Sequence, residues 1–314
     1  MRWDDFRRSD NVDDARDDSG GGGFGMPGGG GFGIPVGGGG LGIGTVFVLG
    51  LIGWALGIDP SLLIGGAEIL TGGGQQQAPY ERVDRPRTSR NAPPSDETGQ
   101  FVSAVLGETE DTWTDVFQQS GQTYRRPRLV LYAGSLPTPC AYAQSAMGPF
   151  YCPRDERVYL DTSFFRDMQR KFRACSSDKA CEFAEAYVIA HEVGHHVQNL
   201  LGILPKAQQA QQSSNSRTQA NQIQVRVELQ ADCLAGVWAN RANKRRSFIE
   251  PGDVDQALQT ATAIGDDRLQ KQAQGYVVPD SFTHGSSEQR KRWFLNGFQQ
   301  GTVAACNTFN TAQL

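Results

Sequence analysis

The residues that could carry out chemistry lie in one short stretch, from His191 to His196. Its order is His-Glu-x-x-His, with His191 and His195 four residues apart and Glu192 directly after the first histidine. On a helix, residues four apart project from one face, so both imidazoles could bind the same small cation. A carboxylate at position 192 can reach a water on that cation. The pattern predicts the core of a zinc hydrolase with Glu192 as general base.

The surrounding sequence predicts the helix that this geometry requires. Residues 182–201 carry apolar side chains at helical spacing, and Gly202 follows as a C-cap. Three of the chain's four histidines fall within the motif, so chance placement is a weak alternative. The other alternative, histidines that are only packed or exposed, is the commoner situation for a lone histidine but not for this spacing.

A hydrolytic zinc site usually has three protein ligands and leaves one position for water. The best candidate for the third ligand is Glu228, on a predicted helix at about 218–241 whose small residues permit close approach to the first helix. Asp232 follows one turn later on the same face, where its carboxylate could accept a hydrogen bond from a ligand imidazole. Asp232 itself, Glu185 and His284 remain alternatives for the third ligand.

His284 could have a second role. It precedes a predicted capping box, Ser286 to Gln289, that opens a helix. An imidazole near zinc could donate a hydrogen bond to the oxyanion of a tetrahedral intermediate, which makes His284 a catalytic candidate. The alternative is an ordinary surface histidine in a loop.

The composition of the 314 residues changes along the chain. A net charge of −4 and a pI of about 5.6 give no basic footprint for nucleic acid. Residues 1–40, polar and then almost all glycine, are expected to form a disordered tail. Residues 71–95 are expected to be a flexible linker, and residues 96–314 the folded catalytic domain.

Residues 41–70 are predicted to be a membrane segment with its interface. The uncharged run 41–58 would span roughly 27 Å, just enough for a bilayer core. A buried core helix is the alternative, but five internal glycines disfavour it. Basic residues flank the run on both sides and do not set its orientation. All six cysteines follow it, so we expect a single-pass protein of the cell membrane, with its catalytic domain on the periplasmic or extracytoplasmic side.

The six cysteines form no C-x-x-C pair, which argues against a thiolate zinc site. Their even number and loop-scale spacing suggest disulfides, although reduced thiols in a cytosolic enzyme remain the alternative. Among the 15 possible pairings we expect three bonds, Cys140–Cys152, Cys175–Cys181 and Cys233–Cys306.

Two short segments, 128–133 and 157–161, are predicted strands. Residues 158–160 could be an edge strand that holds a substrate backbone by β-augmentation, or equally an ordinary core strand. Residues 204–223, rich in Gln, Ser and Asn, could form a solvated helix or a mobile flap.

The two motif segments, HEVGHHVQ and VELQADCLAGVWA, resemble the bacterial putative neutral zinc metallopeptidase family. Three further segments are also similar to it: GPFYCP with VYLD, SFTHGSSEQR, and the N-terminal MRWDDFRRSDNVDDAR. The resemblance covers nearly the whole chain. The segment from Glu228 to Asp232 is also similar to the third-ligand motif of the membrane-embedded heat-shock protease group.

The resemblance implies a membrane-anchored zinc peptidase of zincin type. Its fold would be α+β, a mostly helical domain with a small β-sheet, preceded by one transmembrane helix. By position the resemblance supports His191, His195 and Glu228 as ligands of Zn²⁺ and Glu192 as catalytic base.

The expected function is therefore a zinc-dependent endopeptidase, in which a zinc-activated water attacks a peptide or protein substrate. The alternative is a non-catalytic, zinc-stabilised binding domain on the membrane surface. Glu192 argues against that alternative, because a structural zinc site has no use for a base.

Overall fold

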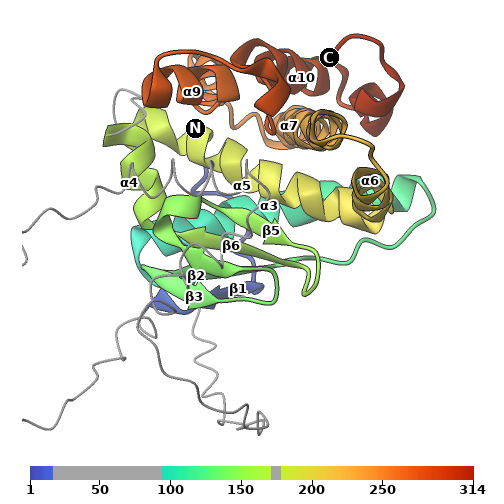
Figure 1. Cartoon of the computed structure of the whole chain (residues 1–314). Coiled ribbons are helices and arrows are strands. Elements are labelled where there is room, and N and C mark those ends of the chain that lie inside the picture. Colours follow the sequence, from blue (N-terminus) through green and yellow to red (C-terminus); the bar gives the residue numbers. More distant parts are fainter. Residues whose placement is uncertain (17–93, 171–177) are drawn as a thin grey trace, which may run out of the picture. The chain divides into compact units, whose positions relative to one another are not determined.

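The computed structural model describes residues 1–16, 94–170 and 178–314 (Figure 1). Its class is α+β, mostly helical with small sheets, as expected. Within these ranges no helix has the length and apolar character needed to cross a bilayer. The expected membrane segment, 41–70, and nearly all of the expected linker lie outside the described residues.

The main sheet has four strands in the order β1-β2-β6-β5. Strands β1 (Val12–Asp14), β2 (Arg128–Tyr132) and β6 (Arg157–Asp161) are parallel, and β5 (Phe150–Cys152) pairs antiparallel with β6. Successive strand residues face opposite sides, so the sheet contributes to two cores. One side packs on the helices through Leu129, Leu131, Val158 and Leu160. The other side, with Val130, Tyr132 and Tyr159, packs with the smaller sheet of β3 (Ser135–Pro137) and β4 (Tyr142–Gln144).

Strand β6 is an inner strand, so of the two alternatives for residues 158–160 the edge strand is wrong and the core strand is confirmed. β6 pairs with β2 on one side and with β5 on the other, which leaves no free edge. The edge beyond β6 is β5, whose three residues are too short to give a periodic signal in the sequence.

The helix that carries the motif, α5 (Asp178–Leu200), lies between the sheet and the C-terminal helices (Figure 1). Together with α3 (Glu97–Gln119) it packs on the sheet, and α7 (Arg217–Arg246) crosses its far side. Nearly every turn of α5 is buried, from Phe183 to Val197. A helix that is buried on all sides holds its side chains rigidly, which suits a site built on it.

The remaining helices complete the domain. Residues 204–223 fall in α6 and the start of α7, joined by a turn at 213–216, and are largely exposed, which agrees with the solvated-helix alternative. The predicted capping box at Ser286 and Gln289 is confirmed at the start of α10. The bounds are α4 (Ser163–Arg170), α6 (Ile203–Gln212), α8 (Asp253–Ala263), α9 (Asp266–Gln274) and α10 (Ser287–Gln300), with short 3-10 turns at Ser145–Met147, η3 (Pro279–Ser281), η4 (Val303–Cys306) and η5 (Thr308–Asn310).

Glycines permit the close approach of the helices. A Cβ on Gly194 would lie 3.1 Å from the carbonyl oxygen of Ala231, at the crossing of α5 and α7. A Cβ on Gly297 of α10 would lie 1.9 Å from the carbonyl oxygen of Cys233 on α7. Gly194 lies between the two motif histidines, so this crossing brings α7 directly against them.

Two of the predicted disulfides are present, Cys140–Cys152 and Cys233–Cys306. Cys181 is also disulfide-bonded, and its predicted partner Cys175 lies outside the described residues. The Cys233–Cys306 bond joins α7 to the C-terminal tail.

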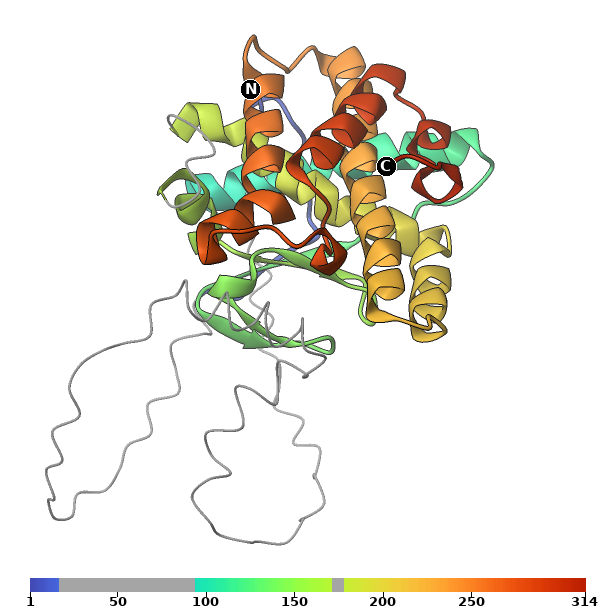
Figure 2. The same cartoon turned by 45° about the horizontal axis from the view of Figure 1, so that its top comes forward.

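The N-terminal residues 1–16 are part of the fold, so the expectation that they belong to a disordered tail is wrong. Figure 2 shows this segment in blue, running from the start of α8 to the sheet, where β1 pairs with β2. Its polar residues satisfy a buried carboxylate on α3: Arg7, Ser9 and Asn11 all donate hydrogen bonds to Glu110, at 2.6 to 2.7 Å. A buried carboxylate without such partners would be costly, and composition alone does not show that this polar segment has a buried acceptor.

Replacing Phe6 with Ala should therefore destabilise the whole domain. Phe6 is 4% exposed and packs edge-on against Phe248, with ring centroids 5.1 Å apart. Removing a buried aromatic ring costs about 3–5 kcal/mol in the free energy of unfolding. Urea denaturation measures the loss, and Asp4→Ala, at an exposed position, is the control. Equal stability of both variants would show that the segment does not pack in solution.

Candidate metal centre

Three ligand-type side chains meet where α5 and α7 cross. The Nε2 atoms of His191 and His195 lie 3.2 and 3.5 Å from Oε2 of Glu228. The three residues are buried, and one ligand atom from each lies within 4.8 Å of the others. Ligand atoms around a tetrahedral zinc are about 3.3 Å apart, since zinc–nitrogen bonds are about 2.0 Å long. The two separations that involve Glu228 therefore match those around a tetrahedral zinc ion.

The second ring nitrogen of each histidine has an acceptor. Nδ1 of His191 lies 2.8 Å from Oδ1 of Asp232, and Nδ1 of His195 lies 2.8 Å from Oε1 of Gln198. An acceptor at Nδ1 places the proton there and leaves the lone pair of Nε2 for a metal. Asp232 thus lies beside His191, as the sequence predicted, and not among the candidate ligand atoms.

Asp232 is held in turn by two residues from other parts of the chain. Arg290 of α10 donates to both carboxylate oxygens at 2.8 and 2.9 Å, and the hydroxyl of Tyr187 donates to Oδ1. Burial alone would raise the pKa of Asp232, but Arg290 and His191 outweigh it and hold the pKa well below its usual range. The carboxylate therefore stays ionised and keeps His191 oriented.

Glu228 is fixed through its other oxygen, since Gln224 donates to Oε1 at 2.7 Å, one turn earlier on α7. Burial raises the pKa of Glu228, but His195 and His191 outweigh it and hold the pKa well below its ordinary value. The pKa of His191 is raised to about 10, because Asp232 and Glu228 outweigh the effect of burial. Carboxylates that attract a proton so strongly also attract a cation.

The buried charges of the site have a net negative charge that a divalent cation would balance. Glu192, Glu228 and Asp232 are three buried carboxylates, and Arg290 is one buried guanidinium. Three negative charges against one positive leave two negative charges when the histidines are neutral. Because buried charges must be compensated, this balance suits a divalent ion.

Glu192 lies at the site but outside the set of ligand atoms. It is 7% exposed, and burial raises its pKa above the ordinary 4.5. The backbone N–H of Tyr151, on β5, opposes that rise, so Glu192 faces the edge strand. A carboxylate with a raised pKa beside a metal site is suited to accept and return a proton.

His196, the third histidine of the motif, connects the edge strand to α5. Its Nδ1 lies 3.0 Å from the hydroxyl of Tyr151, and its Nε2 lies 2.6 Å from the carbonyl oxygen of Arg125. The carbonyl can only accept, so Nε2 carries the proton and Nδ1 accepts from Tyr151. His196 therefore holds β5 beside Glu192 and points away from the ligand cluster.

His284 is not a ligand in this arrangement but lies close to the cluster. Its loop packs on α7 beside Glu228: a Cβ on Gly285 would lie 3.1 Å from Leu229. Nδ1 of His284 lies 3.2 Å from Asp266, whose carboxylate also accepts the backbone N–H groups of residues 283–285. Burial lowers the pKa of His284, but Asp266 and Glu228 together outweigh it and raise the pKa above its ordinary value. The side chain is 43% exposed.

With this geometry established, comparison with known proteins assigns the family. The model of the family described as "Putative neutral zinc metallopeptidase" matches residues 1–309. The chain belongs to this family. It is 48% identical to the uncharacterized protein YpfJ of Escherichia coli (strain K12) over 309 residues, 98% of this chain and 99% of that protein.

A second similar protein is less closely related. The uncharacterized protein Rv2575 of Mycobacterium tuberculosis (strain ATCC 25618 / H37Rv) is 39% identical over 268 residues, 82% of this chain and 85% of that protein. No solved structure matches the chain. The family assignment includes residues 1–16, in agreement with their place in the fold.

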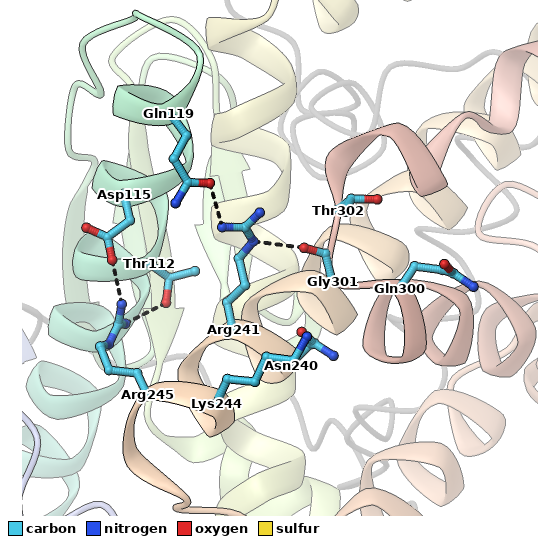
Figure 3. A pocket seen from close by; sticks show the side chains of 10 residues that line it. All are labelled: Thr112, Asp115, Gln119, Asn240, Arg241, Lys244, Arg245, Gln300, Gly301 and Thr302. Atoms are coloured by element: carbon cyan, nitrogen blue, oxygen red, sulfur yellow. Dashed lines mark hydrogen bonds and ion pairs between the residues drawn. The ribbon is translucent and has the colours of Figure 1, made fainter.

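A cavity of about 500 Å³ lies elsewhere, between α3, α7 and α10 (Figure 3). Its arginines are paired: Arg241 donates to the carbonyl of Gly301 and to Gln119, and Arg245 pairs with Asp115. It is lined by α7 from Asn240 onward, about 18 Å along the helix from Glu228. This cavity is therefore separate from the metal centre.

Sequence reasoning did not identify the residues that orient the ligands. Gln198 and Gln224 stand three residues after His195 and four before Glu228, so helical spacing could have found them. Tyr187, four residues before His191, gives the same signal. Arg290 gives no local signal, because it reaches Asp232 from 58 residues away.

Proposed function

We propose that the chain is a zinc-dependent endopeptidase, in which Glu192 acts as general base. The observation that supports this most directly is the division of roles among three buried carboxylates. Glu228 belongs to the ligand cluster, Asp232 orients His191, and Glu192 lies beside the cluster without joining it. A purely structural zinc site has no use for an additional carboxylate in that position.

In this mechanism His191, His195 and Glu228 would hold the zinc ion. The ion would supply Lewis-acid chemistry toward water and toward the carbonyl of the scissile bond. Glu192 takes the proton from the attacking water and returns it to the leaving amine, which its raised pKa favours. His284, with Nδ1 held by Asp266, presents Nε2 as a hydrogen-bond donor for the developing oxyanion.

The substrate backbone would bind along β5. Among the described residues this strand pairs with β6 alone, and its residue Tyr151 faces Glu192. An extended peptide can add to such an edge by main-chain hydrogen bonds, which would place a peptide bond beside the base. Binding through the backbone requires neither chain end, and it therefore favours internal cleavage.

The test is cleavage of a peptide library by the purified full-length chain. We expect cleavage at internal bonds, its loss on treatment with a chelator, and its recovery when zinc is added back. Binding of one zinc per chain without cleavage of any peptide would favour the non-catalytic binding domain. A chain that binds no zinc would overturn both.

The pH profile tests the proposed role of His284. Asp266 accepts at Nδ1, so Nε2 carries a proton only in the charged form of the ring. Activity should therefore fall as pH rises through the pKa of His284, which lies above its ordinary 6.5. In His284→Gln the amide donates at every pH, so this alkaline limb should disappear. At neutral pH the variant should lose less kcat than the roughly 10²–10³-fold that removal of an oxyanion donor costs. An unchanged alkaline limb would exclude His284.

We also propose that the domain lies outside the cytoplasm. The disulfides Cys140–Cys152 and Cys233–Cys306 favour an oxidising compartment for the domain, outside the cytoplasm. Because β1 pairs with β2, residues 1–16 and 94–314 must lie on the same side of any membrane. One crossing within 41–70 would separate them, so a single-pass arrangement does not agree with this fold.

Protease-accessibility mapping can decide this point. We expect protease sites inserted at residues 30 and 80 of the full chain to be cut together when spheroplasts are treated from outside. Cutting at the second site alone would restore the single-pass topology and would mean that β1 does not pair with β2 in the cell.

A further inference from the structure

A hydrogen-bonded relay leads from His195 to the C-terminal tail. His195 Nδ1 donates to Oε1 of Gln198 at 2.8 Å. The amide nitrogen of Gln198 donates to the carbonyl of Val227 at 2.8 Å and to Oε1 of Gln230 at 3.0 Å. The amide nitrogen of Gln230 then donates to the carbonyl of Cys306 at 2.8 Å. Two glutamines on different helices thus connect a ligand histidine to the tail.

Both amide orientations are fixed by groups that can only accept. The carbonyl of Val227 requires the nitrogen of Gln198 on its side, which turns the oxygen of Gln198 toward His195. The carbonyl of Cys306 requires the nitrogen of Gln230, which leaves the oxygen of Gln230 to accept from Gln198. The relay therefore has one direction, and it sets the proton of His195 on Nδ1.

Because the relay is buried, the loss of any one of its hydrogen bonds is costly. Gln198 is fully buried, Gln230 is 7% exposed and Cys306 is 1% exposed. An unpaired amide at such a position carries the full cost of its desolvation, so losing one partner disturbs the next. Rotation of the Gln198 amide would face its nitrogen toward Nδ1 of His195, which favours the wrong tautomer for metal binding.

The last acceptor of the relay depends on a covalent anchor. Cys306 is bonded to Cys233, a fully buried residue on α7 one turn after Gln230. Beyond the disulfide, Thr308 donates to the carbonyl of Arg226, and Arg226 donates to the carbonyls of Thr308 and Thr311. The tail is therefore clamped on the same helix that carries Glu228.

We propose that Gln198 and Gln230 are positioning residues for His195, and that the Cys233–Cys306 disulfide anchors their relay, so that zinc affinity depends on the C-terminal tail. The proposal rests on the proposed zinc site. It assigns the tail a role in holding the metal, although no tail residue lies in the ligand cluster.

The positioning role of Gln198 and Gln230 is tested by zinc binding. The zinc dissociation constants of the full-length chain are measured by competition with a coloured chelator. Loss of a residue that supports a metal ligand typically weakens binding about 10–100-fold. We expect a loss in that range for Gln198→Met and a smaller one for Gln230→Met. The control is Gln100→Met, which removes an amide with two hydrogen bonds, as Gln230→Met does, but lies on α3, away from the metal centre.

Substitution of cobalt for zinc adds a measurement that a change in the stability of the fold does not affect. The visible absorption of bound Co²⁺ reports ligand geometry, so Gln198→Met should change the spectrum and Gln100→Met should not. If both relay variants match the control in zinc affinity and in the cobalt spectrum, the relay has no positioning role. If the wild-type chain binds no zinc, the proposed zinc site itself fails, which is a different result.

The anchor is tested by removing one disulfide at a time. Cys233→Ser with Cys306→Ser should weaken zinc binding, whereas Cys140→Ser with Cys152→Ser should not, because that bond joins the turn between β3 and β4 to the end of β5 and packs in the core on the far side of the sheet. Should the first pair fail to fold, Gln230→Met interrupts the same connection and leaves the disulfide intact. Equal zinc affinity of Gln230→Met and wild type would overturn the dependence on the tail.

Discussion

Replacing Glu192 with Gln is expected to lower kcat for peptide hydrolysis by about 10²–10⁴-fold while zinc stays bound. The amide keeps the shape of the side chain but cannot take a proton from water. The proposed ligand atoms come from His191, His195 and Glu228, so the substitution leaves them in place. Steady-state kinetics on a cleaved library peptide and metal analysis of the same sample measure both quantities.

The control for this variant is Glu185→Gln on the same helix. Glu185 is partly buried but lies outside the ligand cluster, and its variant should keep wild-type activity. Full activity of Glu192→Gln would show that another group is the base. Loss of zinc from Glu192→Gln would instead place Glu192 among the ligands.

The parts of the site that the sequence predicts are those that depend on one helix. Spacing on α5 brings His191 and His195 together, and spacing on α7 puts Asp232 one turn after Glu228. The crossing of these two helices depends on contacts between distant residues, but small residues on both helices predict it. Gly194 and Ala231 lie within contact distance of one another. Most of the candidate metal centre can therefore be predicted from one motif and one pair of closely packed helices.

Long-range partners could not be predicted in the same way. Arg290 reaches Asp232 from α10, and residues Arg7, Ser9 and Asn11 reach Glu110 across about a hundred positions. A polar segment that satisfies a buried charge has the same composition as a solvated tail, because composition does not record the partner. The apolar residues Met1, Trp3, Phe6 and Val12, together with the resemblance of the segment to the family, were the signs that it packs.

Strand order could not be predicted for a related reason. β2 and β6 show the same alternation, because each packs on the helices with one face and on the smaller sheet with the other. Alternation describes the two faces of a strand and says nothing about its two edges. The edge strand β5 lies where the Cys140–Cys152 disulfide and the contact of Tyr151 with His196 hold it, and both are tertiary contacts.

Replacing Glu228 with Gln is expected to weaken zinc binding by more than about 100-fold, beyond the range typical of residues that only support a ligand. The substitution removes one of the buried negative charges that a divalent ion would balance. It also sets an amide against the Nε2 atoms of both histidines, now 3.2 and 3.5 Å from Oε2. Chelator competition measures the zinc dissociation constant.

The matched control is Glu108→Gln, which removes a buried carboxylate paired with Arg245 and Arg246, far from the ligand cluster. It should lower stability and leave zinc affinity unchanged. The two glutamate variants of the metal centre then separate binding from chemistry, because Glu192→Gln keeps the ion and Glu228→Gln loses it. Wild-type zinc affinity in Glu228→Gln would remove Glu228 from the ligand set, and with it the three-ligand site on which proteolysis depends.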